Sequence, residues 1–479
     1  MVNISNKSFL PYLFVVVLTI SVLIKGGFDD SVWLLSGVLA SALLVFRFQR
    51  VPPKPRLIMF GSLVVLYILS ALFHGALREN LSGAAKPLVA FLWWLLLRQE
   101  KPDVRRALWI SGTIAAAAGL ISYALNLAGL PAYPGAVNNG RLYGTFQYAN
   151  AYALFIAVCA FTGCNDLSVR HRYIKITSLV LTHAALLLTL SVGGIAVYAL
   201  AWFLLTFQRR RKALKYWLVG VPAAAFAGFL AVGIRPVSTF LDRILHISDA
   251  LAIGARNILG IGPGRWKFEF LEFQTTFYYV NKVHSAYAEV AAEAGYIALA
   301  LVVIMVIYYI RKTKPGIYKI AALMILFHAA FDFSLSFFSV TLQLLALCTA
   351  GAEEGTAITP KPQLRLILAV PCLLLNLISF APGTDINEMD RYRLLSERYL
   401  REGDIPGAVE AAFQSVEHAP YAVEAYTWVD TLTPLLDANA QEDCLDRITE
   451  LKVYANAHKN PLAELARKLR DKYYSTLGD

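Results

Sequence analysis

The chain has 479 residues, of which 57% are hydrophobic and only 16% are charged, and its mean hydropathy is +0.53. These values exclude an ordinary soluble domain. The formal net charge of +11 does not indicate a nucleic-acid-binding protein. The positive residues lie in short clusters between apolar runs, which is typical of membrane proteins.

The charges also divide the chain into two predicted domains. Residues 1–381 hold 33 Lys and Arg against 15 Asp and Glu, whereas residues 382–479 hold 11 against 18. We therefore predict a basic membrane domain over 1–381 and an acidic, soluble domain over 382–479. The five cysteines show neither a disulfide framework nor the spacing of zinc ligands.

Long apolar runs predict that the first domain is an all-α, polytopic integral membrane protein, because an α-helix satisfies its own backbone in the hydrocarbon core. We expect twelve or thirteen transmembrane helices, at 9–24, 31–46, 57–73, 84–97, 107–129, 146–163, 174–190, 194–207, 214–234, 286–310, 317–333, 336–351 and 364–381. One bent helix over 174–207 is the alternative to two of these. Basic clusters at both ends of that run favour a hairpin that turns at 191–194.

The basic clusters predict the orientation of the domain. They fall in every second loop, from 47–56 to 311–314, and the positive-inside rule makes these loops cytoplasmic. The N-terminus is then cytoplasmic, and the loops 130–145 and 235–285 lie outside. With thirteen spans the C-terminal domain also lies outside, whereas one span fewer would place it in the cytoplasm.

The outer loop 235–285 is too long for a simple connector. Apolar residues at near-helical spacing predict a helix at 238–257. The run Gly260-Ile-Gly-Pro-Gly264 follows. It lacks the strand and helix of a dinucleotide site and the Lys-Ser/Thr of a phosphate loop, so we interpret it as a tight turn that lets its backbone approach a neighbour.

Arginines in the outer loops are candidate ligands for a pyrophosphate. A guanidinium pairs bidentately with phosphate and keeps its charge when it is partly desolvated. Binding of lipid headgroups at the membrane surface is the alternative role. The arginines concerned are Arg141, Arg235, Arg243, Arg256 and Arg265.

His284 lies at the predicted outer mouth of the span 286–310. An imidazole there can accept a proton from a sugar hydroxyl, or it can simply bond to the loop. Glu289 and Glu293 share one face of this span, where carboxylates are costly and usually face a polar cavity. They are expected to orient His284, to line the cavity, or to make an interhelical hydrogen bond. No outer-loop cluster has the composition of a metal site, so no metal and no cofactor are expected.

Two stretches carry a resemblance to a known family. Asn257-Ile-Leu-Gly-Ile-Gly-Pro-Gly264, followed by His284-Ser-Ala-Tyr-Ala-Glu-Val-Ala-Ala-Glu293-Ala-Gly295, resembles the signature region of the O-antigen ligase and polymerase superfamily. Gly140-Arg-Leu-Tyr-Gly-Thr-Phe-Gln-Tyr-Ala-Asn150 is similar to an earlier loop of that family. The similarity extends over residues 105–350.

The resemblance implies a multi-pass glycosyltransferase of the cytoplasmic membrane that works at its outer face. Such an enzyme transfers or polymerises a glycan from an undecaprenyl-pyrophosphate carrier onto an acceptor glycan, lipid or protein. It uses no nucleotide sugar and requires no metal. The resemblance assigns activation of the acceptor hydroxyl to His284 and pyrophosphate binding to Arg243, and it makes Arg141 the basic residue of the earlier loop. Further candidates for substrate binding are Arg256, Arg265 and Glu293.

Val192 stands where many members of that family carry an arginine. Two alternatives therefore stay open. The first is a transporter of polysaccharide or of its lipid carrier, and the second is a catalytically inactive membrane anchor for the C-terminal domain.

The C-terminal domain is predicted to be helical. Its residues at 392, 395, 399, 403, 408 and 420 match the spacing of a tetratricopeptide unit, in which small residues let two helices pack closely. A second unit starts near Tyr426 and then degenerates. We expect a small helical-repeat domain that steers the acceptor, the nascent glycan or a protein partner, with a merely stabilising cap as the alternative.

Overall fold

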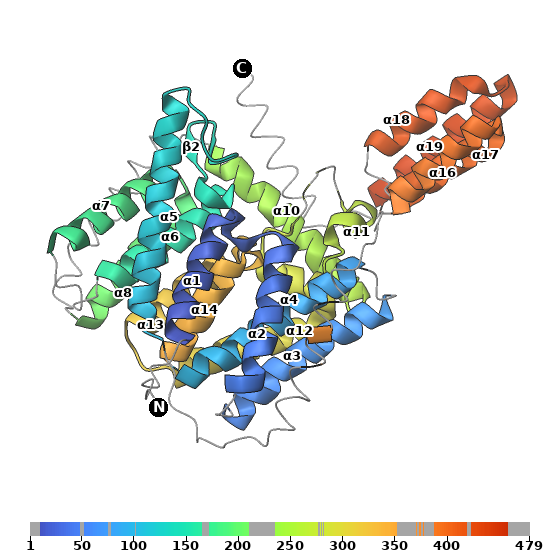
Figure 1. Ribbon diagram of the computed structural model, residues 1–479. Coiled ribbons are helices and arrows are strands. Elements are labelled where there is room, and N and C mark those ends of the chain that lie inside the picture. The colour runs from blue at the N-terminus through green and yellow to red at the C-terminus, as the bar shows by residue number, and fades with distance from the viewer. Residues whose placement is uncertain are drawn as a thin grey trace, which may run out of the picture. The chain divides into compact units, whose positions relative to one another are not determined.

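A computed structural model (Figure 1) describes residues 10–47, 52–74, 78–100, 102–164, 172–209, 235–275, 278, 280, 282–351, 370, 373–374, 377, 388–418 and 423–457. These residues are almost entirely helical. One short antiparallel hairpin interrupts the helices, in which β1 (Val137–Asn138) pairs with β2 (Arg141–Leu142). The prediction of an all-α fold is confirmed.

The α-helices lie in chain order as follows. They are α1 (Leu10–Leu23), α2 (Asp30–Arg47), α3 (Lys54–Phe73), α4 (Arg78–Glu100), α5 (Val104–Leu127), α6 (Ala149–Cys164), α7 (Arg172–Leu188), α8 (Val192–Arg209), α10 (Arg235–Arg256), α11 (Trp266–Phe273), α12 (Ala286–Lys312), α13 (Ile317–His328), α14 (Phe338–Ala350), α16 (Glu388–Glu402), α17 (Ile405–His418), α18 (Val423–Leu432) and α19 (Ala438–Ala457). Short 3₁₀ helices occur at η1 (Lys25–Gly27), η2 (Gly144–Phe146), η4 (Ser334–Ser336) and η5 (Thr433–Leu435).

Helices occupy each predicted span that the structure describes. The spans 214–234 and, apart from a few residues, 364–381 lie outside the described residues. Four described helices are long and apolar enough to cross a membrane, namely Lys54–Phe73, Asn80–Gln99, Val104–Leu127 and Ala286–Lys312. The remaining apolar helices are shorter, and the full number of spans stays a prediction.

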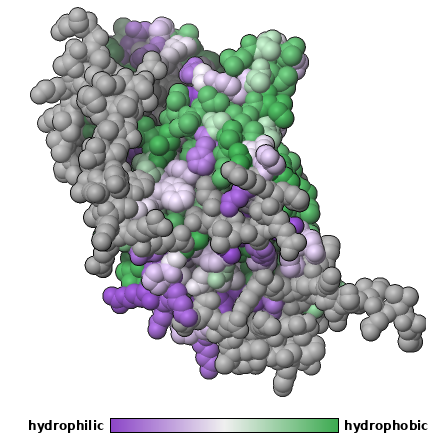
Figure 2. Space-filling view, turned by 90° about the vertical axis from the view of Figure 1, so that its left-hand side faces the viewer, coloured by the Kyte–Doolittle hydropathy of each residue, from purple (hydrophilic) through white to green (hydrophobic). Residues whose placement is uncertain are grey.

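Apolar side chains on the surface fit a membrane setting. Figure 2 shows broad hydrophobic areas on the face in view. On α3, for example, Ile58 is 63% exposed and Phe73 is 75% exposed. Apolar residues that cover a helix on its outer side are stable against lipid and costly in water.

The structure tests two details of the predicted spans, the turn between α7 and α8 and the end of α13. α7 and α8 are separate helices with a left-handed Leu190 between them, at φ 50°, so one continuous bent helix is excluded. The predicted turn at 191–194 is misplaced, because α8 already begins at Val192. The predicted span 317–333 is wrong at its end, because α13 stops at His328. Phe331 N donates to His328 O at 3.0 Å there, which turns the chain out of the helix.

The described chain packs as two compact units. Unit 1 combines Met1–Val65, Ala84–Ile234 and Ala300–Ala381. Unit 2 combines Leu66–Gly83, Arg235–Leu299 and Pro382–Asp479. In unit 1 the most enclosed element is α6, which contacts α5, α7, α8 and α13. Its residues from 151 to 161 are no more than 1% exposed.

The defining feature of unit 2 is a break inside α12. Gly295 has φ 82° and ψ 173°, a conformation that is essentially restricted to glycine. The carbonyls of Ala292 and Glu293 accept hydrogen bonds from Ile261 N at 2.8 Å and Gly262 N at 3.2 Å. The glycine turn thus supplies the partners that the interrupted helix does not.

Close packing makes glycine necessary on both sides of this contact. A Cβ atom on Gly260 would collide with the carbonyl oxygen of Ala292, and one on Gly295 would collide with that of Ile258. Gly83, at the start of α4, lies equally close to the backbone of Pro263. The interpretation of the glycine run as a turn that approaches a neighbouring backbone is confirmed.

The C-terminal helices are tied together by polar side chains. Ser396 Oγ donates to Ala408 O at 2.6 Å and accepts from Trp428 Nε1 at 2.8 Å, which links α16, α17 and α18. Arg447 of α19 pairs with Glu410 at 2.6 Å. This pair lowers the pKa of the Glu410 carboxyl.

The break in α12 generates a stability prediction. Gly295→Ala should lower the free energy of unfolding by at least about 2 kcal/mol, because the backbone conformation excludes a side chain and the added methyl meets Ile258 O. The measurement is thermal unfolding of the detergent-purified full chain. Gly61→Ala in α3 is the matched control, since no atom lies within 4 Å of the added Cβ. Equal unfolding temperatures for the two variants would contradict the account.

Candidate functional site

Side chains from three segments of unit 2 hold the glycine turn. Ser70 Oγ lies 2.6 Å from Leu259 O and 2.8 Å from Glu293 O. Asn80 Nδ2 donates to His74 O at 3.0 Å, and its amide lies directly against Gly262. The end of α3, the start of α4 and the first part of α12 therefore fix the turn from several sides.

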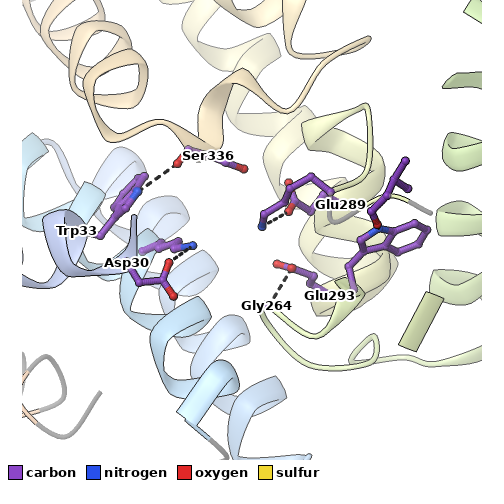
Figure 3. A network of polar contacts seen from close by, with 10 residues as sticks. Asp30, Trp33, Gly264, Glu289, Glu293 and Ser336 are labelled. Atoms are coloured by element: carbon purple, nitrogen blue, oxygen red, sulfur yellow. Dashed lines mark hydrogen bonds and ion pairs between the residues drawn. The ribbon is translucent and has the colours of Figure 1, made fainter. Parts of the chain in front are cut away.

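Glu293 bonds to the turn itself. Its Oε1 accepts a hydrogen bond from Gly264 N at 2.8 Å, and Figure 3 shows this carboxylate directed at the turn. Glu289, one helical turn earlier, pairs with Lys282 Nζ at 2.7 Å. Both carboxylates are buried, and both connect α12 to the loop that precedes it.

Three basic groups come together beside this loop. The ring of His284 stacks on His246 of α10 with centroids 5.3 Å apart and an interplanar angle of 26°. Arg243 lies on α10 at the i−3 position from His246, so the two share a helix face. Burial, and then the charges of His284 and Arg243, lower the pKa of His246 to about 3. His246 is therefore neutral at physiological pH.

A buried carboxylate orders the other side of His246. Asp249, at 0% exposure, accepts from Thr275 N at 3.0 Å, from Thr275 Oγ1 at 2.8 Å and from Tyr278 Oη at 2.8 Å. Burial raises the pKa of Asp249, and the bonds from Thr275 and Tyr278 oppose that rise. The ring of Tyr278 in turn lies 4.4 Å from that of His246. Asp249 thus anchors the residues that pack on the histidine pair.

The remaining candidate arginines lie in different settings. Arg265 forms an ion pair with Glu269 on α11, which offsets part of its charge. Arg256 is exposed and its guanidinium lies 5.9 Å from the centroid of the Phe273 ring. Arg141 belongs to unit 1, where its Nε donates to Thr189 O at 3.0 Å. Of the predicted site residues, the structure brings together His284 and Arg243, whereas Glu293 binds the glycine turn.

A second polar network lies in unit 1. Asp332 accepts from Tyr148 Oη at 2.7 Å and from Ser334 Oγ at 2.8 Å. Ser334 Oγ also lies 3.1 Å from His328 Nδ1. The predicted span 317–333 would place His328 and Asp332 one turn apart on one helix. The structure instead connects them through Ser334, since the helix ends between them.

Sequence reasoning missed His246 and Asp249. The available signal was their place on the predicted helix 238–257, where they follow Arg243 by three and six residues. His246 shares a helix face with Arg243, and Asp249 shares one with His246, by their i,i+3 spacing. Ser70 and Asn80 gave no such signal, because only the folded chain brings them to the glycine turn.

No family model matches the chain, and no curated protein matches it. The resemblance to the O-antigen ligase and polymerase superfamily therefore rests on the residues of this sequence alone.

The shifted histidine generates a prediction about pH. The unfolded chain protonates His246 near its ordinary pKa of 6.5, whereas the folded protein does so only near 3. Stability is therefore complete above pH 6.5 and falls as the pH drops, by up to about 1.4 kcal/mol per pH unit. His246→Phe keeps a ring and removes the titration, so its unfolding temperature should fall less between pH 7.5 and pH 5. Parallel pH profiles for the two proteins would contradict the burial of a neutral His246.

Proposed function

We propose that this protein is a membrane glycosyltransferase that moves a glycan from an undecaprenyl-pyrophosphate carrier onto an acceptor glycan, lipid or protein at the outer face of the cytoplasmic membrane. The observation that supports the proposal is the grouping of His284, His246 and Arg243 next to the start of α12. α12 is itself long and apolar enough to cross a membrane. A base and a fixed cation at that place suit a polar substrate carried on a lipid.

The proposed reaction needs few groups beyond His284 and Arg243. The acceptor hydroxyl oxygen attacks the anomeric carbon of the donor sugar, and the bond from that carbon to the diphosphate oxygen breaks. His284 accepts the hydroxyl proton. Arg243 stabilises the negative charge that develops on the departing diphosphate. Because the diphosphate is already an activated leaving group, positioning and charge stabilisation are sufficient, and we expect no cofactor and no nucleotide.

The other candidate residues receive supporting roles in this proposal. Glu293, bonded to Gly264 N, positions the glycine turn. Arg256 is exposed and available to a lipid or glycan phosphate, whereas Arg265 shares its charge with Glu269. Arg141 binds substrate only if the hydrogen bond of its Nε to Thr189 O leaves the rest of its guanidinium for the ligand.

One observation favours the alternative of a transporter. Transporters place substrates at helices that are broken within the membrane, and α12 is broken at Gly295. Here the carbonyls next to the break already bond to the glycine turn, which leaves fewer groups for a transported ligand. Transport of the lipid-linked glycan without transfer would support this alternative.

The proposed roles of His284 and Arg243 separate by mutation. His284→Ala should lower transfer by about a hundredfold or more, which is the usual contribution of a general base, and should leave binding of undecaprenyl pyrophosphate nearly unchanged. Arg243→Ala should weaken that binding, and Arg243→Lys should restore it poorly because an ammonium cannot form a fork. The measurements are the glycan profile of a complemented deletion strain and lipid binding by purified protein.

The control for this pair is His418→Ala, which alters a histidine of the C-terminal domain. It should retain the wild-type glycan profile. Wild-type transfer by His284→Ala would remove the catalytic role from His284.

We also propose that the C-terminal domain lies outside the cytoplasmic membrane, where it meets the acceptor or a protein partner. Cys444 is a poor reporter of this, because it is only 6% exposed and burial raises the pKa of its thiol. Asp446, exposed on the same helix, is a better position. In a Cys444→Ala background, Asp446→Cys should react with an impermeant maleimide on intact spheroplasts.

Lys314→Cys, in a predicted cytoplasmic loop and exposed, is the matched control and should react only after permeabilisation. If Asp446→Cys behaved like Lys314→Cys, the C-terminal domain would be cytoplasmic and the predicted number of spans would be wrong by one.

A further inference from the structure

His246 is a buried polar side chain that the proposed reaction does not use. It is 4% exposed, and its Nδ1 is buried without a hydrogen-bond partner among the described residues. Leaving such an atom unsatisfied costs stability. A polar atom that stays unsatisfied in the empty protein often marks the place of a ligand group.

The groups around His246 define the chemistry of that ligand. Arg243 and His284 are the basic neighbours, and both lower the pKa of His246 through their charges. Tyr278 packs on the ring from another side. The carboxylate of Asp249 accepts its bonds from Thr275 and Tyr278, and its charge is not among those that shift the pKa of His246. The surroundings of the imidazole therefore favour an anion.

We infer that His246 is a neutral hydrogen-bond donor to the diphosphate, with Nδ1–H directed at a phosphoryl oxygen that Arg243 also holds. This inference rests on the proposed function and adds a residue to its binding site. A neutral imidazole carries one N–H and one lone pair, and an anionic oxygen selects the tautomer with the proton at Nδ1. The bond is charge-assisted and needs no change in the charge of the ring.

A neutral donor has a specific use at this place. Arg243 already supplies a positive charge, and a second fixed cation at His246 would repel it. A charged His246 would also oppose protonation of the stacked His284 when that ring accepts the hydroxyl proton, whereas a neutral His246 does not. His246 therefore strengthens diphosphate binding without opposing the proton transfer.

The test is ligand binding by the full-length protein in nanodiscs, with three variants. His246→Asn places an amide N–H near the position of Nδ1 and should bind undecaprenyl pyrophosphate within about threefold of wild type. His246→Gln offers its amide nearer to the position of Nε2, and His246→Phe offers none. Both should bind about tenfold more weakly or worse, as expected for loss of a hydrogen bond to a charged group.

Folding is checked by thermal unfolding, in which His246→Phe should match or exceed wild type at pH 7.5 because it removes the unsatisfied nitrogen. Inorganic pyrophosphate and phosphatidylglycerol vesicles identify the source of the phosphate. Weakened binding of inorganic pyrophosphate assigns the contact to the diphosphate itself. If only binding of the lipid-linked diphosphate weakens, His246 contacts the diphosphate group only when it is carried on the lipid.

Two results would overturn the inference. One is wild-type affinity of His246→Phe for undecaprenyl pyrophosphate, and the other is an equal loss for phosphatidylglycerol, which would indicate a general headgroup site. If Arg243→Ala loses binding while His246→Phe does not, only this inference fails. If wild-type protein binds no diphosphate, the proposed function fails with it.

Discussion

The site of this protein depends on how the broken backbone of α12 is satisfied. A membrane-length helix that stops being helical at Gly295 exposes the carbonyls of Ala292 and Glu293. Unsatisfied backbone groups are expensive in an apolar environment. The amides of Ile261 and Gly262 pair with these carbonyls, so the loop between α10 and α12 must return to the break. This return of the loop fixes the positions of its two ends, at the end of α10 and at the start of α12.

Several features of unit 2 follow from this constraint. The turn needs left-handed glycines to bring its amides to the carbonyls, and Gly260 at φ 71° is one of them. Glu293 and Ser70 then bond to the turn and hold it. With the turn fixed, α10 can present Arg243 and His246 to the same loop that carries His284 just before α12. A rigid scaffold that holds a loop with functional side chains is a common arrangement in enzymes.

The electrostatics of the site are consistent with one substrate handled by complementary groups. In the proposed reaction Arg243 supplies a positive charge, His284 is the base, and His246 is a neutral polar ring. The oxygens of Asp249 accept hydrogen bonds from Thr275 and Tyr278. Its contribution is to order the residues that pack on His246.

The sequence alone predicted the helices well, because apolar periodicity and length are local signals. The helix predicted at 238–257 is observed at Arg235–Arg256. The turn at Gly260 was also predictable, since clustered glycines indicate backbone approach. The partner of that turn was not predictable, because it appears only when α12 breaks. For the same reason Glu293 gave three possible roles in the sequence and one observed bond in the fold.

His246 shows a different limit of sequence reasoning. A single histidine on an amphipathic helix is most often structural, and the local signal for His246 is only its place three residues after Arg243. Its role depends on a stack with His284, which lies 38 residues away in the chain. The connection of His328 to Asp332 through Ser334 was likewise hidden by the expectation of a continuous helix. Long-range contacts of this kind arise only from the fold.

The central claim is that the site in unit 2 transfers a glycan directly from its lipid carrier. The most direct measurement uses purified protein in liposomes with undecaprenyl-pyrophosphate-linked glycan isolated from the deletion strain, an acceptor extract from the same strain, excess chelator and no nucleotide. We expect the glycan to appear on the acceptor or as a longer lipid-linked chain, with release of undecaprenyl pyrophosphate. An absolute requirement for a divalent ion or a nucleotide sugar, or movement of the glycan across the membrane without a new glycosidic bond, would contradict the account.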